Sequence, residues 1–552
     1  MAKSKLKIIP IGGLGEIGKN MMVIEYEDDI IVIDAGLMFP VEEMLGVDLV
    51  IPDISYLLEN KEKIRGIIVT HGHEDHIGAM TYVLPQLNVP VYSTKLTNGL
   101  ISVKLKEHKA LTHADLRIVP PGGKITLGKF RVEFFPVCHS IPDAVGFIIT
   151  TPVGTLVHTG DFKLDYTPVS GKPTDLSRLA QIGSQGVLLL LSDSTYAELP
   201  GYTPSERIVG ESFDRIMAEA PGRVIVATFS SLISRIQQVI DAAGKHDRRV
   251  CVIGRNMTEI VRMSIELGYL KAPGHILAQI DELKGLAPNR IVFVTTGTQG
   301  EPTSALVRIA NRDHRQIHII PGDTVAISAT PIPGNEGVVA RTIDNLFKQG
   351  AQVLYNTITQ VHVHGHASQE ELKLLLNIVK PKFFVPVHGE YRHLSLHAKL
   401  AHSVGIPKEN TFVMEDGDVL EMDQTSAKLG DKINSSNVYV DGLSVGDIGT
   451  VVLRDRQMLS RDGIVVVIIA VNRQTGKLVG RPDIVSRGFV DPQGYAEMLD
   501  KSRDMVVQVL DHAGARPAEW SFVNAKVRDT LYRYYYEQTK RRPMILPFMV
   551  KV

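Results

Sequence analysis

The chain has 552 residues, which is too many for one hydrophobic core, so we expect two or three domains. An apolar share of 44% and a charged share of 22% are ordinary for a globular protein, and a net charge of −1 excludes a surface that is basic throughout. The sequence has two cysteines, no apolar leader and no apolar run near the roughly 20 residues of a membrane helix. We therefore expect a cytoplasmic protein that neither spans a membrane nor depends on disulfides.

Short apolar runs of strand type dominate the first 205 residues. The runs expected to form strands are residues 6–11, 21–26, 30–34, 64–70, 89–92, 124–127, 130–136, 146–150 and 155–159. Helical spacing is sparser, and its clearest example follows His76. This part of the chain is expected to be a β-rich layered domain with some helices outside.

From about residue 203, helical and strand patterns alternate, which is typical of a largely parallel sheet. The expected helices are residues 204–220, 231–243 and 257–267, and the expected strands are 224–228, 249–253 and 290–295. The first pattern returns after about residue 350, so an inserted domain is the economical explanation. We divide the chain into a core at 1–205 and 351–430, an insertion at 206–350, a linker at 431–450 and a small α/β domain at 451–552.

Six consecutive residues, His71-Gly72-His73-Glu74-Asp75-His76, follow the strand expected at 64–70. Residues two apart on an extended segment point the same way, so His71 and His73 can converge on one divalent ion. The turn after them offers Asp75 and His76 to a second ion. Three histidines and an aspartate in six residues are rare in an ordinary polar turn, so this segment predicts a metal site.

Three further ligand-type residues, His139, Asp161 and His388, follow apolar runs downstream. Each stands at the C-terminal end of an expected strand, where a site built on a rigid sheet draws its side chains. Alone, such a residue is more often structural than a ligand. Together with the six-residue motif, the three complete two sites of three to four ligands each.

This His-x-His-x-Asp-His pattern with a later His, Asp and His resembles the metallo-β-lactamase fold, an αββα sandwich. The resemblance implies two metals, one held by His71, His73 and His139, the other by Asp75, His76 and His388, with Asp161 between them. It also implies that Asp34, in Val32-Ile33-Asp34-Ala35-Gly36, orients a metal ligand without binding the metal itself. Histidine-rich ligation favours zinc or manganese over magnesium. Two such ions can share a hydroxide that is nucleophilic near neutral pH.

The long insertion between Asp193 and His388 resembles the β-CASP domain, the nucleic-acid-processing branch of this fold. In that branch Asp193, within Leu191-Ser192-Asp193-Ser194-Thr195, matches the acid of one motif. His366, within His362-Val363-His364-Gly365-His366-Ala367-Ser368, matches the histidine of another. The resemblance implies that His366 protonates the leaving 3′ oxygen while Asp193 orients it. The residues expected to act in catalysis are Asp75, His76, Asp193 and His366.

The glycine-rich segment at 12–20, the intact six-residue motif and Phe229-Ser230-Ser231 with Arg235-Ile236-Gln237-Gln238 make the chain similar to bacterial ribonuclease J over nearly its whole length. That family degrades and matures RNA from the 5′ end, prefers a 5′ monophosphate and also cuts internally. The resemblance implies a phosphate pocket formed by Ser231, His362, Val363, His364, Gly365 and His366. The family more often has Ser or Ala-Ser where this chain has Val363-His364.

The same resemblance implies partners and a further ion. The partners are RNA, other copies of the chain in a homodimer or homotetramer formed through the C-terminal domain, a ribonuclease J paralogue and an RNA helicase. The further ion is a structural calcium held by Asp441 with backbone oxygens near Leu45 and Val47. Spacing and composition alone indicate none of these.

Three features have a second interpretation. The glycines of residues 13–18 match a dinucleotide-binding pattern, but a hairpin rather than a helix is expected after them, so we reject that function. Cys138 adjoins His139, yet a small buried residue on an apolar strand is the simpler interpretation. The segment Tyr532-Arg533-Tyr534-Tyr535-Tyr536 with the basic residues 540–542 could bind RNA, but helical spacing favours packing inside the C-terminal domain or at a dimer interface.

Two functional alternatives remain open beside a ribonuclease. The metal site could serve DNA or a small phosphodiester; the insertion argues against a small substrate, and no sequence feature shows a 2′-hydroxyl contact. The chain could instead be a scaffold for a more active paralogue, which would predict decayed ligands, whereas every ligand is present.

Overall fold

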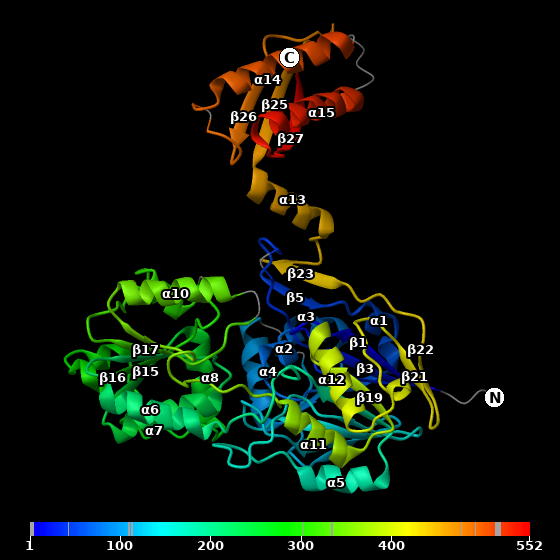
Figure 1. Cartoon of the computed structure of the whole chain (residues 1–552), viewed down its shortest axis with the longest axis vertical. Helices are drawn as coiled ribbons and strands as arrows, with labels where there is room; N and C mark the ends of the chain where they lie inside the picture. The colour runs from blue at the N-terminus through cyan, green and yellow to red at the C-terminus, as the bar shows by residue number, and fades with distance from the viewer. Residues whose placement is uncertain are drawn as a thin grey trace. The chain divides into compact units, whose positions relative to one another are not determined.

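A computed structural model describes residues 5–552 except 42, 109–110, 112–113, 302, 333–334, 476, 492 and 514–519. The chain divides into two compact units, Met1–Val41 with Leu49–Val438 and Glu42–Asp48 with Tyr439–Val552 (Figure 1). Among the described helices, none combines the length and the apolar character that a membrane crossing requires.

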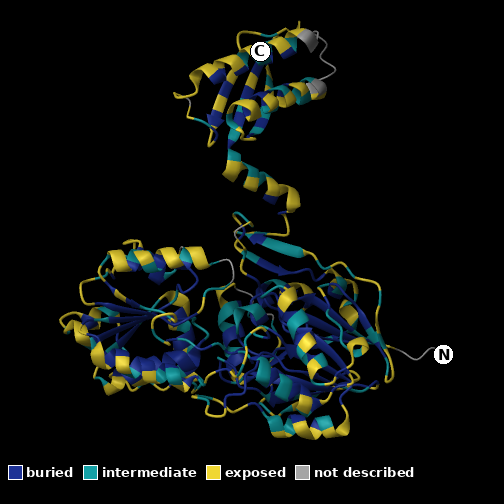
Figure 2. Cartoon of the chain, viewed as in Figure 1, coloured by how far each residue is buried: buried dark blue, intermediate teal, exposed yellow. Residues whose placement is uncertain are grey.

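Two sheets form the core of the first unit. The eight-stranded sheet contains, in spatial order, β22 (Ala427–Leu429), β21 (Leu420–Met422), β1 (Leu6–Gly12), β3 (Met21–Tyr26), β4 (Asp29–Ile33), β6 (Ile64–Ile68), β7 (Val91–Ser93) and β8 (Leu116–Ile118). The six-stranded sheet contains β19 (Phe383–Val387), β13 (Leu189–Asp193), β12 (Thr155–His158), β11 (Val145–Thr150), β10 (Phe130–Pro136) and β9 (Lys124–Leu127). Apolar side chains of both sheets share one hydrophobic core. Figure 2 shows the strands of this part of the chain coloured mostly as buried.

Helices cover the outer sides of these sheets. Helix α4 packs on β7 and β8 of one sheet, and α12 packs on β19 of the other, which confirms the expected αββα sandwich. The helices of this part are α1 (Ser55–Glu59), α2 (Glu74–Ile77), α3 (Met80–Leu87), α4 (Lys95–Glu107), α5 (Leu176–Gln185), α11 (Gln369–Val379) and α12 (Tyr391–Ser403). The short strands β2 (Leu14–Gly15), β5 (Leu49–Pro52) and β20 (Gly389–Glu390) and the 3₁₀ turns η1 (Lys61–Lys63) and η5 (Lys408–Asn410) complete it.

The glycine-rich segment leads into a hairpin and not into a helix. Strands β3 and β4 pair in antiparallel fashion, with Met22 opposite Ile33. A dinucleotide site needs a helix directly after its glycines, so this segment lacks the required geometry. Strand β13, by contrast, is buried along its whole length and runs parallel to β12 and β19. A continuous apolar run is what a strand covered on both faces requires.

The insertion holds a five-stranded sheet in which all pairs are parallel, as expected from its alternating pattern. Its strands, in spatial order, are β15 (Arg249–Ile253), β16 (Ile291–Thr295), β14 (Val224–Ala227), β17 (Thr324–Ile327) and β18 (Gln352–Leu354). Its helices are α6 (Arg207–Glu219), α7 (Ile233–Lys245), α8 (Arg255–Glu266), α9 (Ala305–Ala310), α10 (Glu336–Lys348), η3 (Ile280–Leu283) and η4 (Pro288–Arg290). Because β18 pairs with β17, this sheet extends past the boundary placed at residue 350.

The second unit contains a three-stranded sheet with β25 (Ile464–Val471) between β26 (Asp483–Arg487) and β27 (Met544–Lys551). Its helices are α13 (Thr450–Asp462), α14 (Ala496–Ala513) and α15 (Trp520–Thr539). Tyr534 and Tyr535 lie in its core, whereas Tyr536 is 38% exposed beneath the guanidinium of Arg542. Two of the tyrosines therefore pack within the domain. The expected linker holds β23 (Asn437–Asp441) and β24 (Ser444–Val445), which pair in antiparallel fashion.

Candidate metal centre

The candidate ligands gather at one end of the two sheets because their strands run in the same direction. In the first sheet β4 and β6 are parallel, and Asp34 and His71 follow their carboxyl ends. In the second sheet β12 and β19 each run parallel to β13, and Asp161 and His388 follow their carboxyl ends. Strand β10 is antiparallel to β11, which is antiparallel to β12, so the segment holding His139 leaves β10 in that same direction.

Three histidines form the first ligand group. The Nε2 atom of His71 lies 3.0 Å from Nδ1 of His73, which lies 3.1 Å from Nε2 of His139. Ligands about 2 Å from one tetrahedral ion stand roughly 3.3 Å apart. These three nitrogens therefore have the mutual spacing that one divalent ion would impose, and the sequence order His-x-His brings two of them together as expected.

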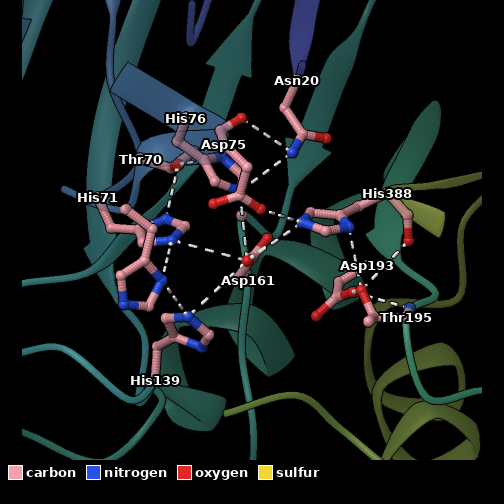
Figure 3. Close-up of polar contacts among 12 residues, drawn as sticks. Asn20, Thr70, His71, Asp75, His76, His139, Asp161, Asp193, Thr195 and His388 are labelled. Atoms are coloured by element: carbon pink, nitrogen blue, oxygen red, sulfur yellow. Dashed lines mark hydrogen bonds and ion pairs between the residues drawn. The ribbon is translucent and has the colours of Figure 1, made fainter. Parts of the chain in front are cut away.

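Two carboxylates and two histidines form the second group, Asp75, His76, Asp161 and His388. The Nε2 atom of His388 lies 3.3 Å from Asp75 Oδ2 and 3.4 Å from Asp161 Oδ2 (Figure 3). It is buried without a hydrogen-bond partner among the described residues. A buried nitrogen aimed at two carboxylates fits a cation between them. The same Asp161 oxygen lies 3.6 Å from Nε2 of His71, so Asp161 adjoins both groups and could bridge two ions.

In several of the ligand histidines, the ring nitrogen that faces away from the two groups also has a hydrogen-bond partner. Nδ1 of His76 lies 2.7 Å from Asp34 Oδ2, and Nδ1 of His139 lies 2.8 Å from the carbonyl oxygen of Gly365. Nδ1 of His71 lies 3.0 Å from the hydroxyl of Thr70, which also lies 2.8 Å from Asp34. Such contacts fix the tautomer and the ring orientation of histidines that bind metals. They support the expected role of Asp34.

Burial and charge divide the histidines into two electrostatic classes. Burial lowers the pKa of His71 and His139 well below the usual value and that of His73 to about 4, so these rings are neutral and their lone pairs are available. Burial alone would also lower the pKa of His388, but Asp161 and Asp75 raise it to about 10. A positive charge is thus stable at the second group, where a divalent cation would displace the proton.

Asp193 and His366 form a hydrogen-bonded pair beside both groups. Nδ1 of His366 lies 2.7 Å from Asp193 Oδ2 and 3.9 Å from Asp161 Oδ2. Burial alone would lower the pKa of His366, but the charges of Asp193 and Asp161 raise it above its usual value. The pair can hold a proton on His366 and present the ring next to a bond that is being hydrolysed.

The residues expected to bind a 5′ phosphate occupy one segment and the start of helix α7. The side chain of Val363 is buried, so only its backbone could face a ligand. His364 stacks on the ring of Tyr196 with centroids 3.9 Å apart, and within the described part of the chain Nδ1 of His364 has no hydrogen-bond partner. Burial lowers the pKa of His364 to about 4, so this imidazole is neutral at pH 7. Ser231 lies one turn before Arg235.

Arg235 joins helix α7 to that segment. Its guanidinium is fully buried and lies 3.2 Å from the carbonyl oxygen of Val361 and 3.3 Å from Nδ1 of His362. The hydroxyl of Ser328 donates to the same Val361 carbonyl at 2.6 Å. The helix that follows Ser231 and the segment at 361–366 are therefore neighbours, as the expected pocket requires.

The groups expected to hold calcium contact an arginine instead. The guanidinium of Arg456 lies 2.6 Å from Asp441 Oδ2 and 3.0 Å from the carbonyl oxygen of Leu45. A cationic side chain already neutralises this carboxylate, and calcium takes six to eight oxygen ligands. In this arrangement the residues do not fit a calcium ion. The backbone N–H of Val47 donates to the carbonyl oxygen of Met44 at 3.1 Å.

Sequence reasoning missed several polar residues around the centre. The side-chain amide of Asn20 lies 3.1 Å from the carbonyl oxygen of Asp75 and 3.3 Å from Nε2 of His76 (Figure 3). Thr70, Thr195 and Arg235 were also not singled out as site residues, because a single threonine or arginine carries no spacing signal. The thiol of Cys138 is buried, and burial raises its pKa to about 12, which disfavours a thiolate near neutral pH and agrees with a structural role.

Family models match most of the chain. Residues 14–203 match the metallo-β-lactamase superfamily, 221–346 the ribonuclease J β-CASP domain, 351–414 the RNA specificity domain of Zn-dependent metallo-hydrolases and 451–552 the ribonuclease J C-terminal domain. Ribonuclease J2 of Bacillus subtilis is 45% identical over 548 residues, which cover 99% of each chain. The chain belongs to the ribonuclease J family.

Other members of this ribonuclease J family show the same extent of similarity. Ribonuclease J 1 of Streptococcus pyogenes is 44% identical over 99% of this chain and 98% of that protein, and ribonuclease J of Thermus thermophilus is 43% identical over 99% and 95%. A protein of unknown function from Enterococcus faecalis, known from a crystal structure, is 17% identical with a TM-score of 0.54 over 76% of this chain and 100% of its own, which shows a shared fold. This ribonuclease J family member is a metal-dependent, RNA-binding ribonuclease.

Proposed function

We propose that this ribonuclease removes nucleotides from the 5′ end of RNA, prefers a 5′ monophosphate and also cuts internally, in RNA maturation and decay. The observation that carries the proposal is the 2.8 Å hydrogen bond between His139 of the metal centre and Gly365 of the segment expected to hold the phosphate. A terminal phosphate bound along that segment would place the first phosphodiester near the metal ligands.

The proposed ligand set assigns His71, His73 and His139 to one ion, Asp75, His76 and His388 to the other, and Asp161 to both. Two divalent ions would supply a hydroxide nucleophile and neutralise charge on the phosphoryl oxygens. The donor set, five histidine nitrogens and two carboxylates, favours zinc or manganese as the working metal. We do not assign a calcium ion, because Arg456 already contacts Asp441 and Leu45.

In the proposed reaction, His366 gives the proton that the leaving 3′ oxygen needs. Asp193 holds Nδ1 of His366, so Nε2 is the atom that faces the departing oxygen. The phosphorus–oxygen bond breaks on the 3′ side of the first nucleotide, and the phosphate stays on the second. The shortened RNA therefore again carries a 5′ monophosphate, which suits a pocket formed by Ser231 and the segment from His362 to His366.

The proposal also covers the assembly and the protein partners of this ribonuclease. We expect a homodimer or homotetramer, pairing with a ribonuclease J paralogue and association with an RNA helicase, in the cytoplasm. These expectations rest on family membership alone. A nuclease that acts on DNA and a scaffold subunit for an active paralogue remain the alternatives.

The test uses RNA labelled at its 5′ end that bears a monophosphate or a triphosphate, incubated with Mn²⁺ or Zn²⁺. The proposal expects a labelled mononucleotide, released faster from the monophosphate by the wild type and absent with Asp75→Ala. Cleavage of DNA of the same sequence would show whether the enzyme requires the 2′-hydroxyl of RNA. Equal rates on both 5′ ends would contradict the phosphate preference, and binding without cleavage under every metal would favour the scaffold.

A further inference from the structure

Thr195 lies between a candidate metal ligand and the Asp193–His366 pair. Its hydroxyl oxygen is 3.0 Å from Nδ1 of His388 and 2.8 Å from Oδ1 of Asp193 (Figure 3). Its backbone N–H donates to the same Asp193 oxygen at 3.0 Å. The Thr195 hydroxyl therefore connects His388, which follows β19, with Asp193, which ends β13.

The chemistry of the neighbours fixes the direction of these hydrogen bonds. Asp193 accepts the backbone N–H of Thr195 on one oxygen and Nδ1–H of His366 on the other, which are the contacts of an ionised carboxylate. An ionised carboxylate only accepts, and Oδ1 of Asp193 is nearer to the Thr195 hydroxyl, at 2.8 Å, than the carbonyl oxygen of His388 is, at 3.3 Å, so the single hydroxyl proton goes to Asp193. The hydroxyl oxygen is then free to accept, and the atom facing it is Nδ1 of His388. That nitrogen must carry the proton.

With one proton held on Nδ1, the nitrogen of His388 that gives up its proton to a divalent cation is Nε2, the atom that faces Asp75 and Asp161. We propose that Thr195 is a positioning residue that holds His388 in the tautomer able to bind the second metal while it holds Asp193 toward His366. Thr195 acts through these neighbours and touches no reacting atom. The inference rests on the ligand set proposed above and not on the preference for a 5′ monophosphate.

The backbone of His388 supports the same role. His388 has a left-handed conformation with φ of 56°, which a residue with a side chain adopts only when its surroundings fix it. The backbone N–H of Ser194 donates to the carbonyl oxygen of His388 at 3.3 Å. The Ser194-Thr195 segment thus holds both the backbone and the ring of this ligand.

The arrangement at His388 differs from that at His76, the other histidine of the second group. His76 is held by the carboxylate of Asp34, a strong acceptor. His388 is held by a neutral hydroxyl whose own proton is committed to Asp193. The metal centre and the proton-donating pair are therefore joined through one side chain, and removing its hydroxyl should disturb both.

Thr195→Val and Thr195→Ser form a matched pair for the test, because the first keeps the shape without the hydroxyl and the second keeps the hydroxyl. Zn²⁺ alone, and Mn²⁺ alone, would be titrated calorimetrically into metal-free full-length protein without RNA. We expect Thr195→Val to bind one of its two ions about 10–100-fold more weakly than the wild type. Thr195→Ser should bind both as the wild type does, and kcat at saturating metal should fall in Thr195→Val with little change in KM.

Several outcomes would overturn the role of Thr195. They are wild-type affinity for both ions in Thr195→Val, an equal loss in Thr195→Ser, and an equal loss at both ion sites. Thr195→Ala replaces Thr195→Val if the valine variant lacks the thermal transition of the wild type. Asp75→Ala is the reference for loss of the second ion. A wild type that binds one ion would overturn both the ligand set and the inference, whereas wild-type metal binding with no 5′ preference would affect the proposed function alone.

Discussion

Nδ1 of His139 lies 2.8 Å from the carbonyl oxygen of Gly365, so a candidate metal ligand and the proposed phosphate-binding segment share a hydrogen bond. The two residues also pack so closely that a Cβ atom on Gly365 would stand 2.5 Å from Cε1 of His139. No side chain fits at residue 365 unless the ring or the segment moves. The geometry of the first ligand group and the position of the segment are therefore coupled.

This coupling predicts the effect of Gly365→Ala. The added methyl group should displace His139, weaken binding of one ion about 10–100-fold and lower the cleavage rate on every RNA, whatever its 5′ end. Metal titration and cleavage assays on monophosphate and triphosphate RNA would measure both effects. Gly337→Ala is the control, because a Cβ atom there meets no atom of the described residues within 4 Å. Wild-type metal affinity in Gly365→Ala would contradict the prediction and would show that the segment moves while His139 stays in place.

A second prediction concerns the proton on His366. Asp193→Asn keeps the shape of the side chain but removes the charge that, against the effect of burial, raises the pKa of His366. A general acid works below its pKa, so the rate falls as the pH rises through it. In Asp193→Asn that pKa is lower. We expect kcat to fall by about 10²–10⁴-fold and the alkaline limb of the pH–kcat profile to move to lower pH.

Steady-state kinetics from pH 6 to 10 at saturating metal would test this prediction. Asp214→Asn is a matched control, since Asp214 pairs with His246 on the insertion and is 42% exposed. An alkaline limb that stays in place in Asp193→Asn would assign the proton to another group.

Part of this centre could be predicted because its residues carry information in their spacing. His71, His73, Asp75 and His76 lie within six residues, and the structure brings them together with His139, Asp161 and His388 at the ends of buried strands. A run such as 383–387 is apolar because β19 is covered on both faces, and the residue after it is necessarily at the sheet edge. Local pattern and position thus point to the same group of side chains.

The residues that orient these ligands could not be predicted in the same way. Thr195 and Thr70 matter because a ring nitrogen from another strand lies within hydrogen-bond distance, and no local pattern encodes that distance. Strands β17 and β18 were not among the expected strands, although strands of similar length, such as β12 and β14, were. Arg456 contacts Asp441, which argues against the calcium expected there, and only the fold places those two side chains together.

A third prediction concerns the buried charges that anchor the segment at 361–366. Arg235 donates to Glu206, and Lys163 lies 3.8 Å from Asp165 and 3.9 Å from Glu206, so two cations and two carboxylates share one buried site. Arg235→Met would leave an uncompensated negative charge and should cost about 3–5 kcal/mol of stability. The double variant Arg235→Met, Glu206→Gln restores neutrality and should regain a large part of that loss.

Denaturant unfolding of the single and double variants would measure the coupling between Arg235 and Glu206. Arg262→Met serves as the control, because Arg262 is 59% exposed and should change stability by no more than about 0.5 kcal/mol. Equal stability of Arg235→Met and Arg262→Met would contradict the anchor. Loss of the preference for 5′-monophosphorylated RNA in the folded double variant would further show that Arg235 positions the segment.

The last prediction uses Asp416, which is not among the proposed metal ligands or catalytic residues. Burial and the nearby charge of Glu16 raise the pKa of Asp416 to about 7, although Lys19 acts in the opposite direction. The unfolded carboxyl loses its proton near its ordinary value of about 3.9. Between those two pH values the folded state binds more protons than the unfolded state, so Asp416 makes the protein less stable as the pH rises from about 4 to about 7.

Asp416→Asn removes this dependence and keeps an oxygen for the backbone N–H of Leu14, which donates to Asp416 at 3.0 Å. We expect the variant to match the wild type in thermal stability near pH 4 and to exceed it near pH 8, by on the order of 2 °C in Tm. Melting curves of both proteins at the two pH values would measure the difference. Asp423→Asn should show no such gain at pH 8, because hydrogen bonds from Thr425 and Ser426 lower the pKa of Asp423, so its carboxylate already favours the folded state. A variant less stable than the wild type at pH 8 would mean that the ion pair between Asp416 and Lys19 outweighs the cost of burying the carboxylate.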